Sequence, residues 1–580
     1  MKKWFFTALI AIVGTYVQAQ TVPSHEQYVK IGSDSQKWYQ AYQNWNEGDY
    51  LYKNDETAKE NENFFISRIK PRTRFTFTAT QVNESLNPAR KLLWWCPIGV
   101  SSWNAVPAYF FNGEVFSMWS YVDIYGNWTA PMLQAPAAFL DVCHKNGVSA
   151  SVVAAVSFGT VPDPSDGGHG STIAALYDGG YEKLLKYLHY YGVDGIGWNS
   201  EFLWNKLNVI KFKNLLGDAY TNAADYGVPN FHNVWYGFTL NSGGISDGSC
   251  LTSNFSDWFH YNGKITSNAY FLNYGWRSTP SYLSRSQETA KSFQGRSSFD
   301  VYGGINCQSG YDIETFTEFE SYELSLGLWG AHNTNMMYAA SGENGSTALQ
   351  KQATYQLVSE NTFTGSSYNP VNTPENNNTI QMSSKSTNFC GFSNFIVARS
   401  TLTCEDLSDD PFVTYFNLGN GQFFNIEGRR EFTNGWYNIG MQDYLPTWRW
   451  WWTKTFMGKN ASDASTDMKA EFTWDDAWFG GSCLQISGET TAAYLQLFKT
   501  KYATAQSGDK LTIRYKVLSG NGKIEWACST EAAPTKAVSA TIISNAAASD
   551  EWVEKTINIG NGRSDLKVHN STLALIGLKF

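Results

Sequence analysis

Charge is scarce in this chain and nowhere concentrated. Asp, Glu, Lys and Arg make up 16% of its 580 residues, against about 25% in ordinary soluble domains. The formal net charge is −9, and no run of basic residues occurs. Because nucleic acids and anionic membrane surfaces are bound through clustered Lys and Arg, we expect neither of them as a partner.

Metal-binding patterns are also absent from the sequence. The eight cysteines are scattered with none in a CxxC pair, and the 8 histidines form no ligand cluster. We therefore expect no metal and no other cofactor. Cys390 and Cys404 form the one pairing that we would test as a disulfide, which export would permit.

Only one long apolar run stands out, and it lies at the start of the chain. Lys2 and Lys3 precede apolar residues 4–13, and the small-residue sequence Val17-Gln18-Ala19 follows. This pattern predicts a signal peptide over residues 1–19 and export to the periplasm, the cell surface or the medium. No later run is long enough to span a bilayer, so we expect an exported protein without a membrane span. We also expect a monomer.

Aromatic residues, in contrast, are abundant. The chain has 23 Trp, 33 Tyr and 36 Phe. Such rings fill cores, and those with a polar edge also suit platforms for the faces of sugars.

Apolar strands alternate with helical segments between residues 91 and 452. Apolar residues recur at helical spacing over Ala135–Asn146, Tyr181–Tyr190 and Leu207–Ala224. Strands are predicted over Leu92–Ile98, Met118–Tyr125, Val148–Val156, Val193–Trp198, Trp235–Phe238, Tyr270–Tyr274, Phe299–Ile305 and Leu324–Trp329. This alternation predicts an α/β fold with a (β/α)8 barrel as the catalytic domain.

Two further regions flank the predicted barrel. Residues 20–90 are polar and irregular, and we interpret them as an N-terminal extension. Residues 453–580 contain short alternating strands separated by turns, which predicts a C-terminal β-sandwich as an accessory domain.

The stretch before Glu201 has the order of a parallel α/β unit. Gly192 ends a helix, an apolar strand follows, and that strand ends in Asn199-Ser200-Glu201. Side chains alternate along a strand, so Asn199 and Glu201 point the same way, roughly 6.6 Å apart at about 3.3 Å per residue. The carboxyl end of a barrel strand is a catalytic position. The same three residues also fit a turn followed by a solvated acid.

One acid beside one amide suits a particular route of glycoside cleavage. Glu201 has no partner acid nearby on its strand, since Asp194 lies on the opposite face and is expected to be structural. The 2-acetamido group of an N-acetylglucosamine can itself attack the anomeric carbon. The enzyme then needs a group that orients this amide and an acid that protonates the leaving oxygen. Burial would raise the pKa of Glu201 and suit it to the acid role.

Ten stretches, in order along the chain, carry a resemblance to a known family. They are Leu93–Asn104, Trp119–Asp123, Lys145–Val148, Val193–Glu201, Val234–Tyr236, Phe271–Trp276, Val301–Asn306, Pro411–Glu427, Trp436–Arg449 and Phe472–Gly488. Together they resemble glycoside hydrolase family 85, the endo-β-N-acetylglucosaminidases that cut the core of N-linked glycans. The resemblance implies a retaining hydrolase that cleaves the GlcNAc-β1,4-GlcNAc bond through an oxazoline, with an N-glycan or glycoprotein as its substrate.

The same resemblance implies roles for single residues. Asn199 corresponds to the amide that orients the acetamido group, and Glu201 to the general acid and base. Tyr236 matches a tyrosine near the substrate amide, although a core strand tyrosine is the other interpretation. Four residues in matching segments are candidates for substrate binding, with core packing as the alternative for Trp119 and Trp276: Trp119, Trp198, Asn273 and Trp276.

Family 18 chitinases, whose strand reads D-x-x-D-x-D-x-E, are the natural rival. Aligned on Glu201, this chain has Asp194, Gly197 and Asn199, so two of the three expected aspartates are missing. The chain also departs from family 85 in segments that would shape the glycan cleft: Asp247–Leu251, Gly304–Gly310 and Ile124–Trp128. A catalytically silent glycan-binding protein and a family 18-like chitinase therefore remain as alternative functions.

Overall fold

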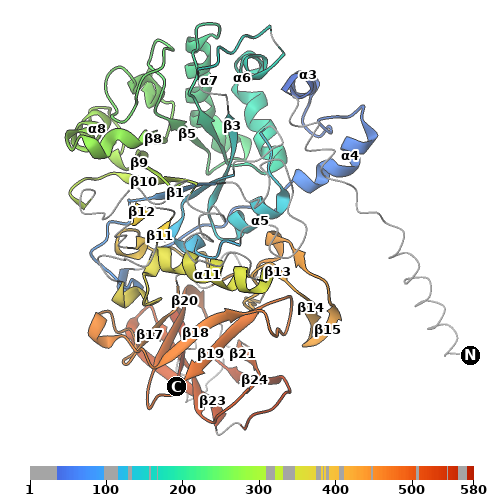
Figure 1. Ribbon diagram of the computed structural model, residues 1–580, viewed down its shortest axis with the longest axis vertical. Coiled ribbons are helices and arrows are strands. Elements are labelled where there is room, and N and C mark those ends of the chain that lie inside the picture. Colours follow the sequence, from blue (N-terminus) through green and yellow to red (C-terminus); the bar gives the residue numbers. More distant parts are fainter. Residues whose placement is uncertain are drawn as a thin grey trace, which may run out of the picture.

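The computed structural model describes residues 35–76, 78–96, 115–127, 133–155, 159–165, 167–307, 320–330, 347–373, 381–382, 385–386, 391–403, 411–445, 449–504, 509–544, 547–559, 568 and 571–580. The predicted signal peptide and the cysteine pair Cys390 and Cys404 lie outside these residues. In the described part, a barrel surrounded by helices occupies one end of the molecule and antiparallel sheets occupy the other (Figure 1).

Eight parallel strands close into a barrel in the order β1-β10-β9-β8-β5-β4-β3-β2. Their bounds are β1 (Leu92–Cys96), β2 (Ile124–Asn127), β3 (Ser149–Ala155), β4 (Gly195–Asn199), β5 (His232–Tyr236), β8 (Ala269–Leu272), β9 (Val301–Asn306) and β10 (Ser325–Trp329). The predicted α/β barrel is confirmed.

Helices cover the outside of the barrel. These are α5 (Ala137–Lys145), α6 (His169–Tyr191), α7 (Val209–Asn222), α8 (Ser281–Lys291) and α11 (Ala348–Thr364). Between β5 and β8, where every residue is described, no α-helix forms. A 3₁₀ turn at Ser256–Trp258 and a hairpin of β6 (His260–Tyr261) and β7 (Lys264–Ile265) take its place.

The second predicted strand begins later than expected. The chain forms a 3₁₀ turn at Trp119–Tyr121, and β2 starts only at Ile124. Hydrogen bonds from the backbone of Tyr121 to Met118 and of Val122 to Trp119 close this turn. The apolar side chains of the run are buried, so they contribute to the core without pairing as a strand.

Two large rings fill the interior of the barrel. Trp95 of β1 and Phe271 of β8 lie 5.7 Å apart at an angle of 67°. A Cβ on Gly197 would lie 2.7 Å from the Trp95 ring, and one on Gly327 would lie 2.5 Å from the Phe271 ring. Glycines in these strands therefore make room for the two rings, and the barrel is a packed core.

The N-terminal extension is more ordered than its composition predicts. It contains α3 (Ser35–Asn44) and α4 (Glu56–Glu62). The indole N–H of Trp38 donates to the Tyr187 hydroxyl of α6 at 3.2 Å, and both side chains are fully buried. The aromatic residues in α3 therefore join the barrel core, although the surrounding sequence is polar.

The C-terminal part consists of antiparallel sheets around a second core. The main sheet has the order β17-β20-β25-β22-β23, with bounds Trp451–Thr453, Tyr494–Ala503, Thr572–Lys579, Lys523–Thr530 and Ala533–Ser544. Two-stranded sheets accompany it: β18 (Met468–Thr473) with β19 (Cys483–Gly488), and β21 (Lys510–Tyr515) with β24 (Val553–Asn558). The C-terminal β-sandwich was predicted over residues 453–580, and antiparallel sheets are found there, beginning at Trp451.

Candidate active site at the carboxyl ends of the strands

The candidate site begins with the loop that leads into β4. Helix α6 ends at Tyr191, and Gly192 follows in the left-handed conformation at φ 74°, which favours glycine. Strand β4 then runs through the barrel wall and ends at Asn199. The predicted order of helix, turn, strand and polar tip is confirmed.

Asp194 lies at the other end of this strand and has a structural role. Its carboxylate accepts a hydrogen bond from the Ala150 amide at 2.7 Å and lies 2.9 Å from Nε2 of His144. Burial by itself would lower the pKa of His144, but the Asp194 carboxylate raises it above its ordinary value. The expectation that Asp194 is structural is confirmed.

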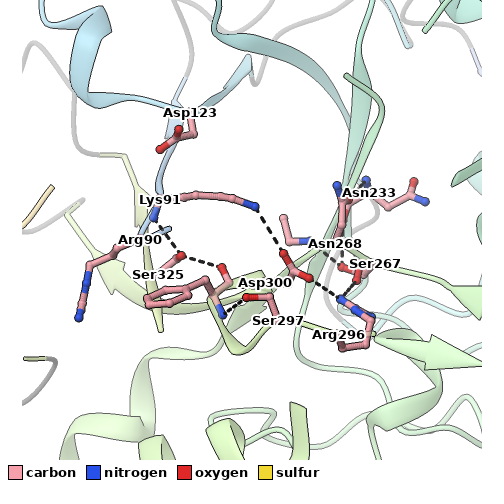
Figure 2. A network of polar contacts seen from close by, with 12 residues as sticks. Arg90, Lys91, Asp123, Asn233, Ser267, Asn268, Arg296, Ser297, Asp300 and Ser325 are labelled. Carbon is pink, nitrogen blue, oxygen red and sulfur yellow. Dashed lines mark hydrogen bonds and ion pairs between the residues drawn. The ribbon is translucent and has the colours of Figure 1, made fainter. Parts of the chain in front are cut away.

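The residues that immediately precede β2 and β9 are also aspartates with cationic partners. Asp123 lies 3.2 Å from Arg399. Figure 2 shows Asp300 between Lys91 at 3.4 Å and Arg296 at 3.3 Å. The N-terminal ends of the strands thus carry a network of paired charges.

Asn199 and Tyr236 are neighbours at the opposite end of the barrel. Trp198 of β4 is paired in register with Trp235 of β5, so the next residue of each strand lies beside the other. Adjacent strands are about 4.8 Å apart. The barrel therefore places the predicted amide beside the predicted tyrosine.

Glu201 lies two residues beyond β4 and is half-buried. Burial raises the pKa of its carboxyl, and a hydrogen bond from the Asn199 side chain partly offsets that effect. Among the described residues, no lysine, arginine or histidine pairs with Glu201. A carboxyl in this environment keeps its proton to a higher pH than an exposed glutamate.

Neighbouring loops hold the tip of β4 in place. The Ser200 hydroxyl donates to the carbonyl of Tyr236 at 2.8 Å, and the Thr239 hydroxyl donates to the carbonyl of Ser200 at 2.6 Å. On the other side, the Gly159 amide donates to the carbonyl of Glu201 at 2.9 Å. Glu201 is thereby fixed between the loops that follow β3 and β5.

Asn273 holds the tyrosine of the site. Its Oδ1 accepts hydrogen bonds from the Tyr236 hydroxyl at 3.0 Å and from the Tyr274 amide at 2.7 Å. Burial, followed by the Glu201 charge, raises the pKa of Tyr236, so its phenol stays neutral. Asn199, Glu201, Tyr236 and Asn273 are therefore brought together.

The three tryptophans predicted to bind sugar do not lie in an open cleft. Trp119, Trp198 and Trp276 are 2%, 3% and 1% exposed, and each indole N–H donates to a protein oxygen. Trp198 points outward against Phe212 of α7. A ring must expose a face to stack on a sugar, so the predicted substrate-binding role is wrong for these three residues, which pack in the core.

The departures from the family pattern lie partly beside this site. Asp247 is exposed, its carboxylate accepts a hydrogen bond from the Ser249 amide at 3.0 Å, and its charge acts on Tyr236. Residues 308–310 and Trp128 lie outside the described residues. The sequence patterns did not single out Tyr274, whose ring lies beside that of Tyr236 with centroids 6.1 Å apart; its place directly after Asn273 was the available signal.

The described residues can be compared with the expectation of no metal site and no membrane span. No cluster of three or more His, Cys, Asp or Glu side chains that could hold a metal ion occurs among them. None of the described helices combines the length and the apolar character that crossing a membrane requires.

Comparison with known proteins gives the class of the enzyme. Residues 107–424, more than half of the chain, match the model of glycosyl hydrolase family 85. The site and this match define a glycoside hydrolase. The chain belongs to glycosyl hydrolase family 85 and is of the endo-β-N-acetylglucosaminidase type.

Solved structures support the fold. The glycoside hydrolase domain of Endo-D from Streptococcus pneumoniae R6 is 20% identical and has a TM-score of 0.72, over 93% of this chain and 78% of that one. Two other solved structures are much more distant. A family 18 chitinase from Crocus vernus is 12% identical and has a TM-score of 0.27, over 41% of this chain and 92% of that one. An endo-β-N-acetylglucosaminidase from Cordyceps militaris is 12% identical and has a TM-score of 0.26, over 45% of this chain and 88% of that one. No curated protein matches the chain in sequence.

Proposed function

We propose that this protein is a retaining endo-β-N-acetylglucosaminidase that cleaves the GlcNAc-β1,4-GlcNAc bond in the core of N-linked glycans. The observation that carries the proposal is the contact between Asn199 and Glu201 at the tip of β4, where burial raises the pKa of the acid. An amide and a protonated acid together supply both functions that acetamido-assisted cleavage requires.

In the first step, neutral Glu201 donates its proton to the glycosidic oxygen as the bond to the anomeric carbon breaks. The carbonyl oxygen of the substrate's acetamido group forms the new bond to that carbon, which gives an oxazolinium ion. Asn199 orients the acetamido group for this attack, and Tyr236 lies beside Asn199 to contact the same group. The leaving glycan fragment departs as an alcohol.

In the second step, the same carboxylate acts as a base. Glu201 takes a proton from water while the water oxygen attacks the anomeric carbon from the side that the leaving group vacated. The bond to the acetamido oxygen breaks, and the amide is restored. Two displacements at one carbon retain its configuration, and Glu201 ends the cycle protonated.

A conventional pair of carboxylates is the chemical rival, with Asp247 as the second acid. The position of Asp247 argues against this role, because it is exposed and its Oδ1 is engaged by Ser249. In the acetamido-assisted route, Asp247→Asn keeps hydrolytic activity whereas Asn199→Ala loses it. The two-carboxylate route requires the reverse result.

Export fits this substrate, because N-linked glycoproteins are met outside the cytoplasm. The signal peptide predicted over residues 1–19 would deliver the enzyme there. Mass spectrometry of the protein recovered from the culture medium, periplasm and cell surface would locate it, and an intact residue 1 in an intracellular protein would argue against export.

Incubation with a high-mannose glycoprotein tests the proposed function. The expected products are a free glycan and a protein that keeps one GlcNAc on each modified Asn, both measured by mass spectrometry. Binding without release by the wild-type protein would favour the silent glycan-binding protein. Cleavage of chitin oligomers with no action on glycoproteins would favour the family 18-like chitinase.

A further inference from the structure

Two buried hydroxyl groups join the tip of β4 to the end of β5 and the loop that follows it. Ser200 is 1% exposed, and Thr239 is fully buried. The Ser200 hydroxyl donates to the Tyr236 carbonyl at 2.8 Å, and the Thr239 hydroxyl donates to the Ser200 carbonyl at 2.6 Å. The backbone register of β4 with β5 runs to Trp198 and Trp235. The two side chains therefore continue the connection beyond that last pair.

Hydrogen bonds from two other loops hold both peptide groups of Glu201. The Ser200 carbonyl, which accepts from Thr239, belongs to the peptide group that precedes Glu201. The Glu201 carbonyl belongs to the peptide group that follows, and the Gly159 amide donates to this oxygen at 2.9 Å. Because peptide groups are planar, the orientations of these two groups determine φ and ψ of Glu201. They therefore set the direction in which its side chain leaves the backbone.

Thr239 is itself held by the loop in which it lies. It forms an antiparallel bridge with Ile245, and the Ser246 amide donates to the Phe238 carbonyl at 3.0 Å. The loop after β5 thus folds back on itself around Thr239. Because the side chain is fully buried, its single hydroxyl proton goes to the Ser200 carbonyl rather than to water. The donor to the peptide group before Glu201 is therefore fixed in place.

The proposed proton transfer depends on where this side chain points. A general acid must lie within about 2.6–3.2 Å of the oxygen that it protonates. In the proposed reaction, Asn199 and Tyr236 hold the acetamido group while Glu201 reaches the glycosidic oxygen. A displacement of about 1 Å in such a geometry costs on the order of 10²-fold in rate. The bonds that join the two strand ends therefore bear directly on the rate of proton transfer.

We propose that Thr239 and Ser200 are positioning residues that hold Glu201 where it protonates the leaving oxygen of the glycan. This inference rests on the proposed function. Because both side chains are buried, neither touches the substrate, and they act through the backbone of Glu201. Their removal should therefore affect the step that needs the proton more than the rest of the reaction.

Thr239→Val tests the inference on two substrates that differ in their leaving group. Val keeps the branched shape of Thr and lacks the hydroxyl. The quantity to compare is kcat/KM, which reports the steps up to the departure of the leaving group. On a natural glycan it is expected to fall by about 10- to 100-fold, because the leaving alcohol needs a proton. On the nitrophenyl glycoside of the same glycan the loss should stay below about threefold, because nitrophenolate leaves without protonation.

Three further variants separate positioning from general damage. Thr239→Ser keeps the hydroxyl and should recover most of the glycan activity. Ser267→Ala is the matched control at the other end of β5, where the buried Ser267 hydroxyl donates to the Asn233 carbonyl at 2.9 Å. It should leave kcat/KM unchanged on both substrates. Ser200→Ala removes the bond to Tyr236 and should repeat the selective loss, and it decides the outcome if Thr239→Val does not fold.

Several results would overturn the inference while leaving the proposed function intact. They are equal losses on the two substrates in Thr239→Val, an unchanged glycan rate in that variant, a Thr239→Ser protein that is just as slow, and the same selective loss in Ser267→Ala. In each case the wild-type protein still releases the glycan. If the wild-type protein cleaves neither substrate, the proposed function itself is wrong, and this inference is wrong with it.

Discussion

The acidic side chains at the two ends of the barrel have opposite kinds of partner. At the N-terminal end, Asp123, Asp194 and Asp300 each directly precede a strand, and each has a cationic or histidine partner within 3.5 Å. At the C-terminal end, Glu201 is hydrogen-bonded by the neutral Asn199 and pairs with no cation among the described residues.

This difference separates stability from chemistry. A carboxylate held by a cation is bound in its charged form and fixes the elements that it joins. A buried carboxyl without a cation keeps its proton more readily and can transfer it. We infer that the N-terminal end maintains the fold and the C-terminal end performs the reaction, the division that barrel enzymes generally show.

The largest expected effect on activity is at the C-terminal end. Glu201→Gln removes the proposed proton donor and should lower kcat by about 10²- to 10⁴-fold, the usual contribution of a general acid. The unfolding free energy of the variant should not fall, because burial disfavours the charged carboxylate of the wild type and Gln carries no charge. Glycan release measures kcat, and urea denaturation measures the unfolding free energy. A Glu201→Gln protein less stable than the wild type would contradict the inference that the C-terminal end does not maintain the fold.

The largest expected effect on stability is at the N-terminal end. Asp300→Ala leaves the fully buried Arg296 side chain without its carboxylate and should cost about 3–5 kcal/mol. The kcat of the folded fraction should be unchanged. Asp178→Ala is the control: its partner Lys211 and Asp178 itself are both 56% exposed, so denaturation should show a loss below about 1 kcal/mol. Equal losses in the two variants would contradict the role given to the network.

A smaller loss of stability is expected from a substitution in the barrel interior, between the two ends. The added methyl group of Gly197→Ala would lie 2.7 Å from the Trp95 ring, and overpacking of this kind costs about 1–3 kcal/mol. Thermal unfolding measures it against Gly522→Ala, where no atom lies within 4 Å of the new group. A Gly197→Ala protein as stable as the control would show that the interior is loosely packed.

The smallest expected effect is a pH dependence of stability that belongs to Glu201. Burial raises the pKa of its folded-state carboxyl, so the folded protein binds more protons than the unfolded chain just above the ordinary glutamate pKa of about 4.3. Its contribution to stability therefore falls as pH rises through the folded pKa. The difference in unfolding free energy between Glu201→Gln and wild type should grow over this range, and kcat/KM of the wild type should fall with it; a flat difference would contradict the raised pKa.

The sequence predicted the features that depend on local order. Asn199 ends β4 and Glu201 lies two residues beyond it. The strand period predicted that their side chains point the same way, and the hydrogen bond from Asn199 to Glu201 agrees. Gly192 marked the end of α6 because its backbone conformation favours glycine. The alternation of apolar strands and helices was enough to predict the barrel.

Other features depend on contacts between distant segments, which the patterns did not contain. Tyr274 lies at the site only because β5 and β8 are adjacent, so that its ring is beside that of Tyr236. Trp119 is an aromatic residue with a polar edge, the type that binds the faces of sugars. In the structure its indole N–H donates to Gln442, more than 300 residues later, and its ring is buried. Burial of aromatic rings is decided by such tertiary packing.

Asn199→Ala, measured on a glycan and on a preformed sugar oxazoline, tests the central claim most directly. The claim is that the tip of β4 orients the substrate's own acetamido group while Glu201 moves the proton. We predict that the variant loses glycan hydrolysis and still consumes the oxazoline. Hydrolysis of the glycan at the wild-type rate would contradict the account.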